Sequence, residues 1–173
     1  MSPARRAFLV LLLSTAALGH ARVAAQPPSV QTLAIVVHHS NPVENLTFSE
    51  LRRIFMLDTQ TWPHGRKITV VLREQEQPER ADAIRIICGL SEADYDKHIL
   101  FRTFQGSVNI GPRSLQSASA VLRFVYNAPG AIGSVAADQL DPSVKVLRID
   151  GALPGDSRYP LRRASRGTAP EAR

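Results

Sequence analysis

Cysteine and catalytic motifs are scarce in this sequence. The 173 residues contain one cysteine, Cys88, so the chain can form no internal disulfide. Cys88 follows Ile84 and Ile87 on an expected helix, which favours a small buried core residue over a reactive thiol. The sequence has no Gly-x-Ser-x-Gly elbow, no Cys/His pair of recognisable spacing and no His-Glu-x-x-His string. These absences argue against an enzyme.

Residues that commonly bind metals are scattered along the chain. The histidines His38, His39, His64 and His98 lie in separate segments without the spacing of metal ligands. The carboxylates Asp94 and Asp96 point to different faces of an expected helix, and we expect them to serve its N-terminus. The sequence therefore predicts neither a metal site nor a cofactor.

A long apolar segment is also missing. The run from Ala7 to Leu18 is shorter than the roughly 20 residues that cross a bilayer. Arg5-Arg6 precedes it and Val23-Ala24-Ala25 follows it, which is the pattern of a cleavable signal peptide at residues 1–25. The arginine pair leaves twin-arginine export open beside the favoured general secretion. We expect cleavage before Gln26 and a periplasmic or secreted protein that does not span a membrane afterwards.

The body of the chain lacks an excess of charge of either sign. The whole sequence has 21 Lys and Arg against 15 Asp and Glu, but residues 26–157 contain 13 basic and 14 acidic residues. Nucleic-acid binding requires a basic face on the fold itself, so the composition argues against it. The arginines concentrate in residues 158–173, together with Pro, Ser and Gly. We expect this segment to be a disordered basic tail that folding does not need.

Residues 26–157 have the length and pattern of one α/β domain. Continuous β-rich runs predict strands at 33–37, 67–72, 131–135 and 144–149. Between them, helices are expected after the Thr47–Glu50 capping box, from Pro78 to a C-cap at Gly89, from Ser91 to Gly106, and from Ser117 or Ser119 to Asn127. Alternating strands and helices predict a largely parallel sheet with helices on both faces.

Several ordered strings resemble a known family. They are Leu33-Ala34-Ile35-Val36-Val37, Asn41-Pro42-Val43-Glu44-Asn45-Leu46-Thr47, Leu51-Arg52-Arg53-Ile54-Phe55, Trp62-Pro63-His64-Gly65-Arg66, Ile68-Thr69-Val70-Val71-Leu72-Arg73 and Asn127-Ala128-Pro129-Gly130-Ala131-Ile132-Gly133. In this order they resemble the substrate-binding component of phosphate ABC transporters, in the periplasmic binding protein-like superfamily. A complete two-lobed receptor needs about twice this length, so the resemblance implies a single lobe of a type II periplasmic binding protein.

The resemblance implies a ligand-binding role for Arg73, which matches the family's phosphate-contacting arginine. A guanidinium can hold two phosphate oxygens, and Arg73 ends a strand, where open α/β sheets bind ligands. A surface arginine paired with Glu74 or Glu76 is an equally good interpretation. The sequence departs from the family here: Glu74-Gln75-Glu76-Gln77-Pro78 replaces a Ser-Gly-Thr phosphate loop, and Leu57-Asp58 replaces Gly-Lys.

Two functions remain open from the sequence. The first is an extracytoplasmic solute-binding protein that binds phosphate or a related anion weakly and serves an ABC permease or a membrane sensor. The second is an interaction module that has kept the fold and lost the ligand.

Overall fold

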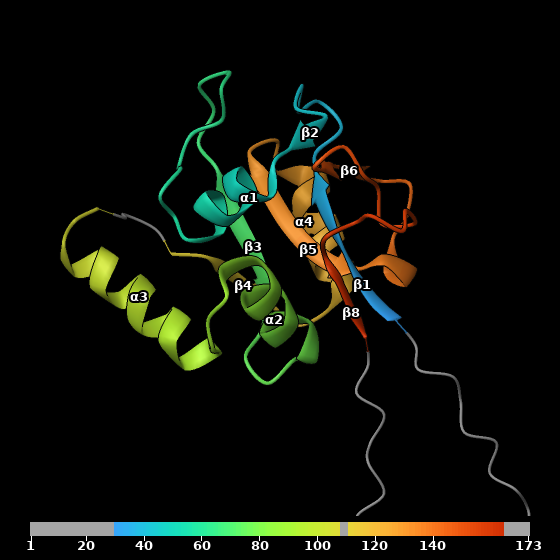
Figure 1. Cartoon of the computed structure of the whole chain (residues 1–173). Coiled ribbons are helices and arrows are strands. Elements are labelled where there is room, and N and C mark those ends of the chain that lie inside the picture. The colour runs from blue at the N-terminus through green and yellow to red at the C-terminus, as the bar shows by residue number, and fades with distance from the viewer. Residues whose placement is uncertain (1–29, 108–110, 165–173) are drawn as a thin grey trace, which may run out of the picture.

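Figure 1 shows the protein as a computed structural model that describes residues 30–107 and 111–164. The expected signal peptide lies outside the described residues, as do residues 165–173 of the expected tail. The helices are α1 (Phe48–Phe55), α2 (Pro78–Ala83), the π-helix η1 (Ile84–Cys88), α3 (Glu92–Phe104), α4 (Ala118–Asn127) and the 3-10 helix η2 (Ala137–Gln139). The strands are β1 (Val30–Val37), β2 (Asn45–Leu46), β3 (Thr69–Arg73), β4 (Arg113–Leu115), β5 (Ala131–Ala136), β6 (Lys145–Val146), β7 (Arg148–Ile149) and β8 (Arg162–Ala164).

The main sheet is mixed, with one strand running against the others. Its order is β4-β3-β5-β1-β6, and β8 also pairs with β1. Strand β3 is parallel to β4 and β5, whereas β1 is antiparallel to β5, β6 and β8. The strands of this sheet other than β1 therefore point in one direction. The expected α/β class and largely parallel sheet are confirmed, with β1 as the exception.

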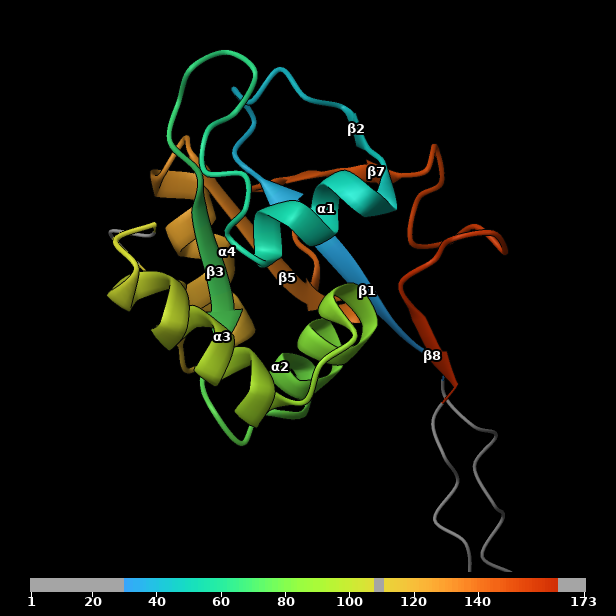
Figure 2. The ribbon, with the colours of Figure 1, turned by 60° about the vertical axis from the view of Figure 1, so that its left-hand side comes forward.

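Helices cover both faces of this sheet, because side chains alternate along each buried strand. Leu33, Ile35 and Val37 of β1 belong to one hydrophobic core, with residues of α1, α2 and η1. Ala34 and Val36 face the other core, where α4 packs. Figure 2 shows α1 and α2 on one side of β1 and β5, with α4 on the far side. The continuous apolar run in β1 is thus the mark of a strand buried on both faces.

The residues expected to start and stop helices do so. Thr47 caps α1 in a complete capping box with Glu50, and the same hydrogen bonds from Thr47 lower the pKa of the Glu50 carboxyl. Pro78 is the first residue of α2, where its missing N–H costs no helical hydrogen bond. Gly89 ends η1 with a left-handed φ of 73°. Ser117, one of two alternatives from the sequence, caps α4 by accepting from the Ala120 amide.

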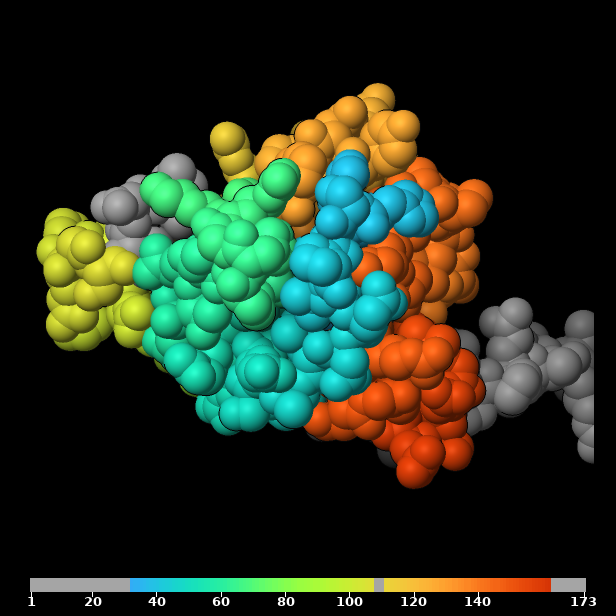
Figure 3. Space-filling view, turned by 90° about the horizontal axis from the view of Figure 1, so that it is seen from above, coloured from blue at the N-terminus to red at the C-terminus, as the bar shows by residue number. Residues whose placement is uncertain are grey.

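Helix α3 is the least buried of the long helices. Its buried residue is Tyr95, whose hydroxyl donates to the Phe55 carbonyl oxygen at 2.7 Å. Leu100, Phe101 and Phe104 are exposed on its outer side. Figure 3 shows α3, in yellow-green, at one end of the molecule. Within the described residues no helix has the length and apolarity needed to span a membrane.

The expected boundary of the disordered tail is wrong for residues 158–164. Tyr159 and Leu161 are buried in the main core, and β8 pairs with the first residues of β1. The Leu33 amide donates to the Leu161 carbonyl oxygen at 3.0 Å. The arginines around these two apolar residues conceal a short edge strand, because its charged side chains keep the segment's average hydrophobicity low.

Four short strands also depart from the sequence prediction. The expected strand at 144–149 is divided at Leu147 into β6, which is antiparallel to β1, and β7, which is parallel to β2. Strands β2 and β4 were not expected. Segments of two or three residues are too short to show a period, so their pairing is decided by tertiary structure.

Candidate functional site

The carboxyl end of β3 brings together the segments that would form an anion site. Arg73 is the last residue of β3 and lies beside Leu115, the last residue of the parallel strand β4. Helix α2 begins five residues after Arg73, and α4 begins three residues after Leu115. Both helices therefore direct their N-termini toward this edge of the sheet. This is the place where open α/β sheets bind ligands.

Arg73 is nearly buried at this edge, with 8% of its surface exposed. Its Nη2 atom donates to Oε1 of Gln77 at 3.0 Å and to the carbonyl oxygen of Gln116 at 2.9 Å. Its Nη1 atom lies 3.8 Å from Oε1 of Glu79. The Nε atom is buried and has no hydrogen-bond partner among the described residues. The guanidinium is thus held in place with part of its donor capacity unused.

The carboxylate that neutralises Arg73 differs from the ones expected from the sequence. Glu79, in the first turn of α2, makes the ion pair. Glu74 and Glu76 instead line a shallow hollow with Arg80 and Ser114. The sequence interpretation named the nearest carboxylates along the chain, whereas the turn at 74–77 directs the first residues of α2 back toward the strand end. Pro78 marks the start of α2, but the path of the turn before it, which brings Glu79 to Arg73, has no local signal in the sequence.

Arg80 is a second buried cation at the same edge, and it was missed from the sequence. It forms ion pairs with Glu92 at 2.9 Å and with Asp96 at 2.8 Å. Gln75 donates to the other Asp96 oxygen at 3.0 Å. Asp96 therefore anchors α3 to α2, and the expectation that it serves its own helix N-terminus is wrong. The Asp94 carboxylate does serve it, since it accepts from the hydroxyl of Ser91, the residue that caps the helix, at 2.6 Å.

Negative charge exceeds positive charge around this edge. The cations are Arg73 and Arg80, and the carboxylates around them are Glu74, Glu76, Glu79, Glu92 and Asp96. An incoming anion would meet both guanidinium groups with carboxylates already beside them. Electrostatics therefore weaken anion binding at Arg73, although the position and orientation of its side chain suit it.

The cysteine and histidines considered from the sequence are held by burial or by contacts within the fold. Cys88 is fully buried, and burial raises the pKa of its thiol to about 12, so the reactive thiolate is scarce at neutral pH. His98 contacts the Met56 carbonyl oxygen, and His39 contacts that of Pro142. Within residues 30–107 and 111–164, no three His, Cys, Asp or Glu side chains gather in a way that could hold a metal ion.

Solved structures that share this fold include phosphate receptors. An ABC-type phosphate transport receptor from Vibrio cholerae is 25% identical with a TM-score of 0.65, over 79% of this chain and 55% of the receptor. A putative phosphate ABC transporter substrate-binding protein from Clostridium perfringens, solved with bound phosphate, is 22% identical with a TM-score of 0.59, over 73% and 48%. PstS from Borrelia burgdorferi is 12% identical with a TM-score of 0.63, over 80% and 57%. The chain has the fold of one lobe of a phosphate-binding receptor.

The chain spans about half the length of the proteins it matches. No sequence-family model matches the chain. The strings that carried the resemblance lie in β1, α1, β3 and β5 with their flanking loops, which form the frame of the main sheet.

The family string ending in Pro-Gly-Ala-Ile-Gly has a packing role in the lobe. A Cβ atom on Gly130 would collide with the carbonyl oxygen of Lys67, and one on Gly133 would come within 2.9 Å of Val121 Cγ1. The Gly130 carbonyl oxygen also accepts from the Trp62 indole at 3.1 Å. These glycines allow close approach of the 62–67 loop and of α4. The string is therefore explained by packing and gives no information about a ligand.

Leu57, which stands where the family commonly has glycine, has a backbone conformation that favours glycine. It follows α1 with a φ of 60°, a left-handed conformation that leucine rarely adopts. Its amide donates to the Ile54 carbonyl oxygen and that of Asp58 to Arg53, which ends the helix. The leucine side chain is buried in the main core, and this burial offsets the backbone strain.

Proposed function

We propose that the protein is an extracytoplasmic solute-binding domain that binds phosphate or a related small anion weakly through Arg73. The observation that carries this proposal is the state of the Arg73 guanidinium, which is nearly buried at the carboxyl end of β3 with its Nε atom unpartnered. A buried donor without a partner costs free energy, and an anion oxygen would satisfy it. The fold shared with phosphate receptors supports the same assignment.

The surroundings of Arg73 explain why the binding should be weak. Glu79 occupies part of the place that an anion would take, and Pro78 removes one of the N–H groups that a helix N-terminus would offer. In a two-lobed receptor the ligand cleft has a wall from each lobe. A single lobe supplies only one of these walls, so it makes fewer contacts with a ligand. The export and the partner belong to the proposal: an ABC permease or a membrane sensor outside the cytoplasm would use the loaded domain.

The alternative is an interaction module that keeps the fold without a ligand. The Arg73–Glu79 ion pair favours it, because an internal carboxylate can replace the anion permanently. An enzyme is the least supported function, for want of a nucleophile and a matching base within the described residues.

A phosphate titration by calorimetry at low salt separates the two functions. We expect weak binding to the wild type, no binding to Arg73→Gln, and binding about three- to tenfold tighter to Glu79→Gln, which removes one negative charge next to the anion. Glu44→Gln is the matched control, because Glu44 pairs with Lys145 in a different part of the molecule. Absence of phosphate binding to every one of these proteins would favour the interaction module.

A further inference from the structure

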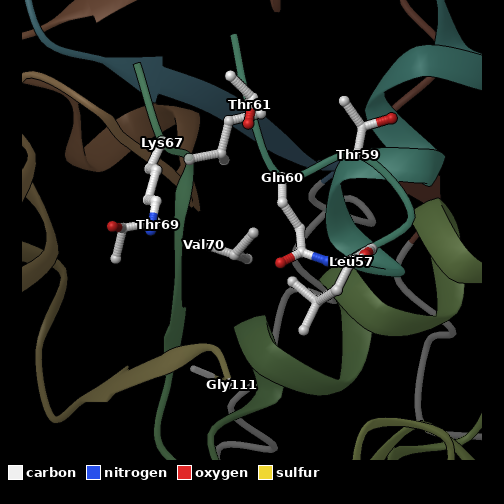
Figure 4. Close-up of a pocket in the computed structure, with 9 residues that line it drawn as sticks. Leu57, Thr59, Gln60, Thr61, Lys67, Thr69, Val70 and Gly111 are labelled. Carbon is white, nitrogen blue, oxygen red and sulfur yellow. Dashed lines mark hydrogen bonds between the residues drawn. The ribbon is translucent and has the colours of Figure 1, made fainter. Parts of the chain in front are cut away.

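A second cavity lies at the amino end of β3, away from Arg73. It has a volume of about 250 Å³, and we call it the β3-edge cavity. Leu57, Gln60, Lys67, Thr69 and Val70 are the lining residues that define it (Figure 4). Strand β4 pairs with β3 from Val71 onward. The edge of β3 at its first two residues is therefore left uncovered by β4, and the cavity forms there.

Lys67 brings an unpaired positive charge to this cavity. Lys97 pairs with Asp94 and Lys145 pairs with Glu44, but the Lys67 amino group has neither a hydrogen bond nor an ion pair within the described residues. Figure 4 shows Lys67 and Thr69 on one wall, with Leu57 and Gln60 on the opposite wall. Among the described residues that line the cavity, none is Asp or Glu. The β3-edge cavity therefore differs from the surroundings of Arg73, where carboxylates lie beside the cation.

Gln60 offers an acceptor whose orientation is fixed by the backbone. Its Nε2 atom donates to the carbonyl oxygens of Ser107 at 2.7 Å and Leu57 at 3.3 Å. Carbonyl oxygens only accept, so the amide nitrogen must point toward them and Oε1 must point away. Figure 4 shows Oε1 on the side of Val70. The cavity thus has a cation on one wall and a free acceptor on the other.

The lining between these two groups is mixed. Leu57, Ile68 and Val70 are apolar, with Leu57 and Val70 almost fully buried, and Thr59, Thr61 and Thr69 carry hydroxyl groups. We propose that the β3-edge cavity binds a small hydroxycarboxylate, with the carboxylate at Lys67, the hydroxyl donating to Gln60 and a short apolar body between them. One lysine matches one negative charge. The volume lies slightly below the range of about 300–1,000 Å³ typical of ligand pockets, so the ligand must be small.

Phosphate suits the cavity less well than a carboxylate does. It carries up to two charges against one lysine and has no apolar part to place against the partly buried Ile68. The inference is thus independent of anion binding at Arg73, which lies at the other end of the same strand.

The test is a calorimetric titration of the full-length protein at low salt with 3-hydroxybutyrate and with butyrate as probes. We expect both to bind, and 3-hydroxybutyrate to bind several-fold more tightly because its hydroxyl adds one hydrogen bond to Gln60. Lys67→Met should weaken both by about tenfold or more, since it removes a charged partner. Lys97→Met is the matched control and should bind as the wild type does.

No binding of either probe to the wild type at millimolar concentration would overturn the inference, and so would equal binding to the wild type and Lys67→Met. Equal binding of the two probes would remove the role of Gln60 and overturn the hydroxycarboxylate assignment. Loss of binding in Arg73→Gln with retention in Lys67→Met would place the carboxylate at the other end of β3. That outcome would overturn this inference and leave the proposed function standing.

Discussion

Gly130 packs its α-carbon against the carbonyl oxygen of Lys67 so closely that a Cβ atom has no room. Because the obstacle is backbone, a side-chain rotation cannot relieve the clash. We expect Gly130→Ala to lower the free energy of unfolding by about 1–3 kcal/mol, the usual cost of overpacking. Urea unfolding measures this, and Gly155→Ala is the control, since a Cβ atom there meets nothing within 4 Å. Equal stability of the two variants would contradict the close approach.

Leu57 allows backbone strain and side-chain burial to be separated. Leu57→Ala keeps the strain of a positive φ and loses a buried side chain, whereas Leu57→Gly loses the side chain and relieves the strain. We expect the glycine variant to be more stable than the alanine variant by about 1 kcal/mol. At Leu72, a buried strand residue, the order should be reversed. Melting of the four variants decides this, and the same order at both sites would refute the explanation.

The C-terminal segment should divide sharply into a part that folding needs and a part that it does not. A chain ending at Ala164 should melt as the full chain does. A chain ending at Ser157 loses the buried side chains of Tyr159 and Leu161, at about 1.5–3 kcal/mol each, and should be several kcal/mol less stable. Similar melting temperatures for both truncations would show that β8 contributes nothing to the core.

Cys88 should make stability depend on pH in the alkaline range. Its pKa is raised to about 12 in the folded protein, while the unfolded value is about 8.5. The protonated thiol is therefore favoured by folding, and this stability is complete below the unfolded pKa and is lost as pH rises toward the folded pKa. Between pH 8 and pH 10, wild type should lose about 2 kcal/mol more than Cys88→Ala. An equal loss of the free energy of unfolding in the two proteins over this range would show that the thiol ionises in the folded state.

Long segments and their caps were predictable from the sequence because the signals are local. The Thr47 capping box, the proline at the start of α2 and the glycine at the end of η1 act within one turn of chain. The antiparallel direction of β1 was not predictable, since a strand buried on both faces has the same apolar run in either direction. The pairing of β8 depends on a free edge of β1 that lies more than a hundred residues away in the chain.

The place of Arg73 in the fold was predictable, and its contacts were not. The strand pattern placed Arg73 at the carboxyl end of β3, where open α/β sheets bind ligands. The partner of Arg73 depends on how the turn at 74–77 directs α2, including a left-handed φ of 68° at Glu76. Sequence patterns favour glycine at such positions, so the turn's path, and with it the role of Glu79, could not be read from the residues.

The pairing of β1 with β8 places Val30 opposite Ala164, at the two ends of the described chain. Figure 1 shows the two strands leaving the body on the same side. A domain whose ends are neighbours can be inserted into a surface loop of another protein without pulling that loop apart. The same geometry permits a circular permutation, in which a short linker joins these ends and new termini open in an exposed turn such as the one at Gly155. A domain built in this way can be transferred from one polypeptide to another as a single unit.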